Sequence, residues 1–139
     1  MKLYHKQFGF PKGTHPALQA FRLSVVRKYS DTLLPVWFHA QERAHQKGIC
    51  LCVTPRWVET ADLVELQVES TRISRVLLRG GYDQYRDLSV VIEATKVIDG
   101  HRRFTGEIVT GWTNSKSDQH RLTAERSKHY IKVKELSHG

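Results

Sequence analysis

Two runs rich in β-branched and aromatic residues lie in the second half of the chain, at 90–98 and 102–112. Such residues fit the pleated, half-buried surface of a strand. Asp99-Gly100 lies between the runs, and this dipeptide is typical of a type I′ turn, because both central residues of that turn need a positive φ. The pattern predicts a long antiparallel hairpin over 90–112, at the centre of a sheet.

The first third of the chain has the helical period instead. Leu18, Phe21, Val25 and Tyr29 recur at helical spacing. Thr14 is a suitable N-cap for this first helix. A second helix is expected over about 34–47, ending at Gly48.

The remaining segments are shorter. The alternation of apolar with polar, mostly acidic residues over 60–70 favours a strand, although the composition would also tolerate a helix, and 71–79 predicts another strand. We also expect a short strand or arm within 1–13, a β-type run over 49–54, a short helix within 119–128 and a last strand over 130–134. The predicted fold class is therefore α+β: one domain over 1–139, with two N-terminal helices packed on an antiparallel sheet of four to five strands.

Composition is that of one globular domain. The chain has 139 residues, 40% of them hydrophobic and 26% charged. No apolar run reaches the roughly 18 residues of a membrane span, and the first residues lack the apolar core of a secretory peptide. Cys50 and Cys52 are too close for an ordinary disulfide within one strand. We therefore expect reduced cysteines, a cytoplasmic location and no membrane partner.

The charge is positive and unevenly distributed. The net charge is +8, and segments 1–58, 59–100 and 101–139 carry +7, −3 and +4. Two basic segments around an acidic middle indicate one basic face, which could line the open side of the sheet. RNA or another polyanion is the natural partner of such a face, although a basic charge also serves solubility alone.

The second predicted helix carries the candidate catalytic groups. His39, Arg43 and Lys47 follow one another at helical spacing. A histidine can transfer protons near neutral pH, and an arginine can bind a phosphate. These are the parts of a metal-independent RNA cleavage, in which the 2′-hydroxyl attacks the neighbouring phosphate. The alternative is a solvated helix face with ordinary polar residues.

Further polar residues lie on or after the hairpin. The candidates for nucleic-acid contact, besides Lys47, are Arg102, Arg103, Trp112, Lys116 and His120. Thr110 ends a strand, where a hydroxyl can help to position a phosphate. Trp112 could stack on a base or be buried. Turn tips are also often basic without any function.

Several classes of chemistry have no sequence support. The Cys50/Cys52 pair lacks the further ligands of a zinc site at a recognised spacing. Neither a Walker A motif nor a dinucleotide-binding Gly-x-Gly-x-x-Gly is present. We therefore expect no metal and no cofactor.

Two segments carry a resemblance to a known group. The segment from Phe38 to Arg43 with Lys47-Gly48-Ile49, and the strand from Glu107 to Trp112, resemble motifs of the RelE/colicin-type small ribonuclease toxins. The resemblance implies a metal-independent endoribonuclease that acts on tRNA or mRNA, often with an antitoxin or another protein partner. By position, it implies catalytic roles for His39, Arg43 and Thr110.

The expected function is therefore that of a small basic endoribonuclease. The alternative is a non-catalytic protein, of the type encoded by phages and mobile elements, that binds nucleic acid or inhibits a host protein.

Overall fold

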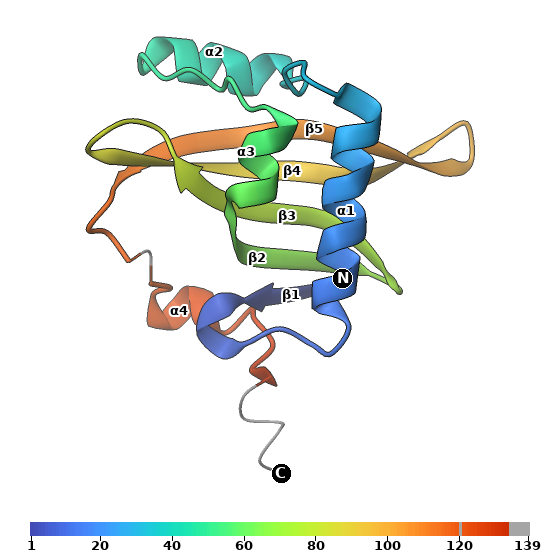
Figure 1. Cartoon of the computed structure of the whole chain (residues 1–139). Coiled ribbons are helices and arrows are strands. Elements are labelled where there is room, and N and C mark those ends of the chain that lie inside the picture. The colour runs from blue at the N-terminus through green and yellow to red at the C-terminus, as the bar shows by residue number, and fades with distance from the viewer. Residues whose placement is uncertain (120, 134–139) are drawn as a thin grey trace.

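A computed structural model describes residues 1–119 and 121–133. It contains a five-stranded antiparallel sheet in the order β1-β2-β3-β4-β5 (Figure 1). This confirms the α+β class. The elements in chain order are β1 (Lys2–His5), η1 (Lys6–Phe8), α1 (Thr14–Tyr29), α2 (Phe38–Gln46), α3 (Pro55–Thr60), β2 (Asp62–Glu69), β3 (Arg72–Gly81), β4 (Arg86–Ile98), β5 (His101–Ser115) and α4 (Ala124–Ser127).

The predicted hairpin is present and longer than expected. Asp99 and Gly100 have φ values of 51° and 76°, as a type I′ turn requires, and Ile98 pairs with His101 across them. The hairpin does not lie at the centre of the sheet, however. β5 is an edge strand, because the chain adds its strands one after another from β1.

The first predicted helix is confirmed as α1, whereas the second is shorter than predicted. Residues ahead of α2 are extended, and Val36 forms a parallel bridge with Ile108 of β5. Trp37 N–H donates to the Ile108 carbonyl at 2.9 Å, and Ile108 N–H donates to the Pro35 carbonyl at 2.9 Å. Pairing with the sheet edge therefore holds this segment out of the helix, and α2 starts only at Phe38.

The sequence pattern did not predict α3. Thr54 caps this six-residue helix by accepting from Trp57 N–H, and Pro55 occupies its first turn. Residues 49–54 form a loop that leads into α3, so the strand expected there is wrong. The last expected strand is also wrong over 130–133, and residue 134 lies outside the described residues.

The hydrophobic core lies between the sheet and the helices. In Figure 1, α1 and α3 cover the front of the sheet, and α2 lies above β5. Side chains from both layers are fully buried here, among them Val25 of α1, Val58 of α3, and Val90 and Ile108 of the sheet. Two backbone carbonyls, those of Val58 and Ala61, accept from the Arg22 guanidinium and so tie α3 to α1.

The segment after β5 covers the β1 side of the opposite face. Ile131 N–H donates to the Leu3 carbonyl at 2.9 Å. Tyr130 donates its hydroxyl to Glu65 at 2.7 Å, and its ring contacts the buried His5 edge to face. Burial, together with the negative charge of Glu65, raises the pKa of Tyr130 to about 12. The hydroxyl is therefore protonated, and available as a donor, over the whole neutral range.

The cysteines differ from expectation. Cys50 and Cys52 are joined in a disulfide, with their Cα atoms 5.3 Å apart. The prediction of reduced thiols assumed a strand, but both residues lie in the loop between α2 and α3 and are exposed. No helix within residues 1–119 and 121–133 is both long and apolar enough to cross a membrane.

Candidate nucleic-acid interface

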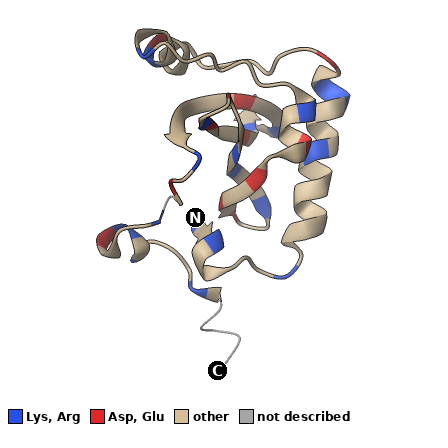
Figure 2. Ribbon diagram, turned by 60° about the vertical axis from the view of Figure 1, so that its left-hand side comes forward, with Lys and Arg blue, Asp and Glu red and all other residues tan. Residues whose placement is uncertain are grey.

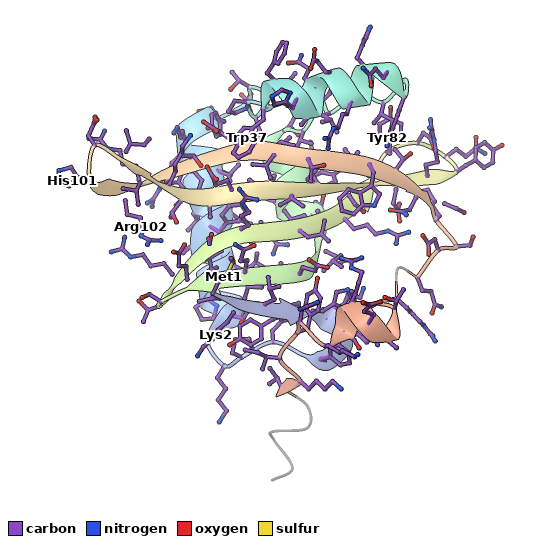
Figure 3. The ribbon with its side chains drawn as sticks, turned by 180° about the vertical axis from the view of Figure 1, so that it is seen from behind. Met1, Lys2, Trp37, Tyr82, His101 and Arg102 are labelled. Carbon is purple, nitrogen blue, oxygen red and sulfur yellow. A yellow bond between two sulfur atoms is a disulfide. The ribbon has the colours of Figure 1, made fainter. Side chains whose placement is uncertain are left out.

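The end of the β4–β5 hairpin projects beyond the rest of the sheet. β3 pairs with β4 only as far as Glu93, whereas β4 and β5 continue to pair up to the turn at Asp99-Gly100. Residues 94–105 therefore form a two-stranded ribbon, which we call the β4–β5 ribbon. Figure 3 shows its labelled residues, His101 and Arg102, beyond the body of the sheet.

Cations lie on both sides of this ribbon. Lys96 is the register partner of Arg103, and Val97 is the partner of Arg102. Because side chains alternate along a strand, the two pairs face opposite sides. Like charges directly opposite one another in a sheet destabilise it. Among the described residues, no carboxylate forms an ion pair with Lys96, Arg102 or Arg103.

The ribbon tip is apolar as well as basic. Val97 is 60% exposed and Ile98 is 39% exposed, and neither belongs to the hydrophobic core. His101 is exposed beside them. The tip thus offers apolar contact area framed by positive charge.

Helix α1 supports the base of the ribbon. Phe104 stacks edge to face on Phe21, with ring centroids 6.0 Å apart. The Lys28 ammonium donates to the Phe104 carbonyl at 3.1 Å, and the Tyr29 hydroxyl donates to the Thr105 carbonyl. Burial, and then the charge of Glu107, raises the pKa of Tyr29. These contacts fix the base of the ribbon on β5 against α1, and they place the Lys28 ammonium beside the cations of the ribbon.

The open face of the sheet is not the basic surface that the sequence suggested. Acidic and basic residues are mixed on this face: register places there, among others, Glu65, Glu93 and Glu107 beside Arg75 and Arg79. Figure 2 shows Lys and Arg on the helices, the strands and the C-terminal segment, rather than gathered on one face. The expectation that basic residues line the open face is therefore wrong.

A polar cluster on this open face fixes the start of α2. The Trp37 indole N–H donates to Glu107 at 2.7 Å. The Arg75 guanidinium lies 5.5 Å from the centroid of the Trp37 ring and 3.5 Å from Glu93. Trp37 directly precedes α2, so this cluster sets where α2 runs along β5.

The proposed catalytic residues lie on two elements, α2 and β5. His39 and Arg43 are exposed on α2, and Lys47 follows at the C-cap of this helix. The His39 ring lies 3.7 Å from Glu42 and stacks on Phe38. Thr110 is half-buried on the open face of β5, opposite Val91. No hydrogen bond or ion pair within the described part of the chain joins His39, Arg43 and Thr110, so their shared role stays a prediction.

The remaining predicted contacts divide between two places. Arg102 and Arg103 lie on the β4–β5 ribbon, as described above. Trp112 is half-buried on β5 opposite Ser89, and Lys116 follows this strand and pairs with Asp87 at 3.1 Å. His120 lies outside the described residues. Trp112 and Lys116 are thus separated from the ribbon by the length of β5.

The described residues hold no group of three or more His, Cys, Asp or Glu side chains that could bind a metal ion. The chain was also compared with protein-family models, curated proteins and solved structures, and none of them matches it.

Two cations of the ribbon, Lys96 and Lys28, were not among the residues predicted from the sequence. Lys96 could have been found, because a two-residue turn at 99–100 places it opposite Arg103. Lys28 could not, since it reaches the ribbon only through the packing of α1 on Phe104.

Proposed function

We propose that this protein binds nucleic acid, with RNA as the expected ligand, through the β4–β5 ribbon. The observation that carries the proposal is the cross-strand pair of Lys96 and Arg103. Two cations face each other on a projecting element, without a carboxylate to neutralise them among the described residues. A phosphate backbone would supply the missing negative charge.

The shape of the ribbon supports the same proposal. A two-stranded ribbon fits the major groove of B-form DNA but not the deep, narrow groove of an RNA helix, so for RNA the shape favours a single-stranded segment. Cations on both sides of the ribbon can contact the backbone of such a segment. The exposed Val97 and Ile98 add apolar area that can contact sugars or bases. The open face of the sheet carries acidic and basic residues that pair with one another, as Glu93 does with Arg75, which leaves the ribbon as the better site for a polyanion.

Cleavage by His39, Arg43 and Thr110 remains a further prediction from the resemblance to small ribonuclease toxins. Binding through the ribbon does not require it. An antitoxin or host-protein partner also stays a prediction.

The test is the affinity for a fluorescently labelled RNA, measured by anisotropy. The variant replaces Lys96, Arg102 and Arg103 with serine. The control replaces three exposed cations outside the ribbon, Lys12, Arg56 and Lys128, and so removes the same charge. We expect the ribbon variant to bind at least tenfold more weakly and the control to change by less than about threefold. Equal losses would mean that net charge alone attracts the RNA, and would refute a site on the ribbon.

The same RNA incubated in EDTA tests cleavage separately. If the chain is a ribonuclease, wild type cleaves the RNA and His39→Ala does not. If neither cleaves while binding persists, the protein is a binding module and the catalytic prediction is wrong.

A further inference from the structure

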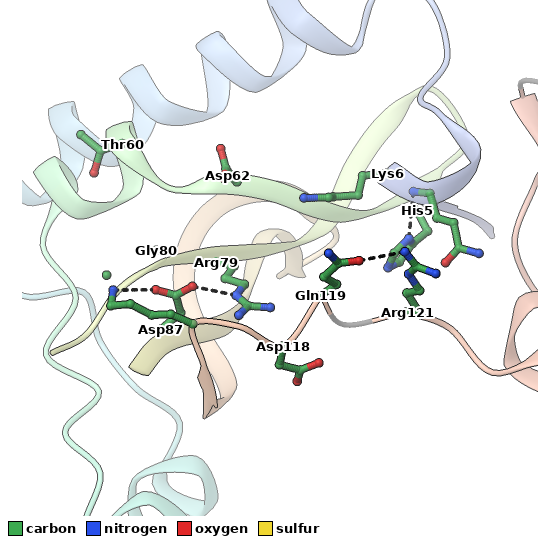
Figure 4. A pocket seen from close by; sticks show the side chains of 13 residues that line it. His5, Lys6, Thr60, Asp62, Arg79, Gly80, Asp87, Asp118, Gln119 and Arg121 are labelled. Carbon is green, nitrogen blue, oxygen red and sulfur yellow. Dashed lines mark hydrogen bonds and ion pairs between the residues drawn. The ribbon is translucent and has the colours of Figure 1, made fainter. Parts of the chain in front are cut away.

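A polar cleft opens at the end of the sheet opposite to the β4–β5 ribbon. Its volume is about 630 Å³, which is within the range of roughly 300–1,000 Å³ of small-molecule sites. Residues from β1 and η1, from β2, β3 and β4, and from the segment after β5 surround it (Figure 4). The charged side chains that matter here are Lys6, Asp62, Arg79, Asp87, Lys116 and Arg121.

One wall of the cleft is a fixed ion cluster. Asp87 accepts from Arg79 at 3.0 Å and from Lys116 at 3.1 Å, and Arg79 also donates to the Ser115 carbonyl at 3.0 Å. Burial alone would raise the pKa of Asp87, but the hydrogen bonds and charges of Lys116 and Arg79 outweigh it and lower that pKa. The carboxylate is thus ionised and already neutralised, and its two cations hold the wall in place.

The other end of the cleft carries two cations that lack such a neutralising partner. Lys6 lies in η1 and Arg121 follows β5, and both are exposed. Their chain segments meet, because Leu122 N–H donates to the Gln7 side chain at 3.3 Å. Arg121 donates to the neutral Gln119 amide at 2.8 Å. Within the described residues, neither Lys6 nor Arg121 forms an ion pair.

We propose that the cleft binds a small phosphorylated polyol, such as a pentose phosphate. The phosphate lies between Lys6 and Arg121, since a guanidinium and an ammonium together complement a doubly charged phosphomonoester. Asp62 is exposed on the same cleft and accepts hydrogen bonds from the hydroxyl groups. This site is independent of nucleic-acid binding by the ribbon.

The test uses ribose 5-phosphate as the probe, with ribose and inorganic phosphate as comparison ligands, in calorimetric titrations of the full chain. Lys6→Ala and Arg121→Ala should each weaken ribose 5-phosphate binding by about tenfold, the usual effect of one charge-assisted hydrogen bond. Lys12→Ala removes an exposed lysine that does not line the cleft, and should leave the affinity unchanged.

Asp62→Asn separates recognition of the polyol from recognition of the phosphate. It should weaken ribose 5-phosphate binding severalfold, without weakening the binding of inorganic phosphate. The proposal is overturned if ribose 5-phosphate does not bind at millimolar concentration, or if Lys6→Ala and Arg121→Ala bind it as wild type does. It is also overturned if inorganic phosphate binds as tightly as ribose 5-phosphate, because the cleft would then recognise only an anion. Circular dichroism and thermal melting of each variant establish that it is folded.

Discussion

Gly80 and Gly81 are neighbours on β3 that should respond differently to the same substitution. A Cβ added at Gly80 would lie 2.9 Å from two ring atoms of Trp57, whereas a Cβ added at Gly81 would meet nothing within 4 Å. The Trp57 ring is held in place, because its indole N–H donates to the Gly81 carbonyl at 2.8 Å. Gly80→Ala must therefore displace either the Trp57 ring, which α3 carries, or the strand beneath it.

The change in the free energy of unfolding caused by Gly80→Ala is the sum of two opposing effects. Alanine in a strand interior gains about 0.5–1 kcal/mol over glycine. Overpacking a well-filled site costs about 1–3 kcal/mol. We expect Gly80→Ala to lower the free energy of unfolding by about 1–2 kcal/mol, and Gly81→Ala to leave it equal or slightly higher. Urea denaturation, followed by circular dichroism, measures both values.

Replacing Trp57 with phenylalanine tests whether the clash with its ring causes the loss of stability in Gly80→Ala. In a Trp57→Phe background the clashing ring atoms are absent, so Gly80→Ala should cost far less than it does in wild type. If Gly80→Ala costs the same in both backgrounds, or nothing in either, Trp57 does not lie over Gly80 and the placement of α3 is wrong.

Two further predictions concern the segment after β5 and the cysteine loop. Because folding raises the pKa of Tyr130 from 10.0 to about 12, its hydrogen bond to Glu65 stabilises the fold below pH 10 and is lost as the pH rises from 10 to 12. Tyr130→Phe should therefore be about 1.5–3 kcal/mol less stable than wild type at pH 8. Urea denaturation should show this difference in stability shrinking above pH 10. A difference that stays constant with pH would contradict the hydrogen bond between Tyr130 and Glu65. The Cys50–Cys52 disulfide closes only a very short loop, so Cys50→Ser/Cys52→Ser should cost roughly 1–2 kcal/mol, and a cost above about 3 kcal/mol would show that the disulfide holds more than its own loop.

Local chemistry explains what the sequence predicted correctly. The turn at Asp99-Gly100 depends only on those two residues. Helix α1 depends on a regular apolar stripe, of which Leu18, Phe21 and Val25 are buried. The failures were non-local. Sheet order places β5 at an edge, and pairing of Val36 with Ile108 shortens α2. Neither effect can be read from a window of neighbouring residues.

The sequence also did not predict the short helix α3 or the cleft, whose residues come from distant parts of the chain. α3 has only six residues, too few for a helical period to appear, and it depends on its Thr54 cap and on the packing of Trp57 against β3. The basic tip of the β4–β5 ribbon was visible in Arg102 and Arg103. The cleft was not, because Lys6 and Arg121 are more than 100 positions apart and meet only through the contact between Gln7 and Leu122.

The salt dependence of RNA binding tests the role of the β4–β5 ribbon most directly. The logarithm of the association constant should fall linearly with the logarithm of salt concentration, with a slope of about −0.7 for each phosphate contacted on a single strand. If Lys96, Arg102 and Arg103 each contact a phosphate, their replacement by serine should make the slope less steep by about 2. An unchanged slope and affinity in this variant would contradict the account, because the RNA would then be bound elsewhere on the protein.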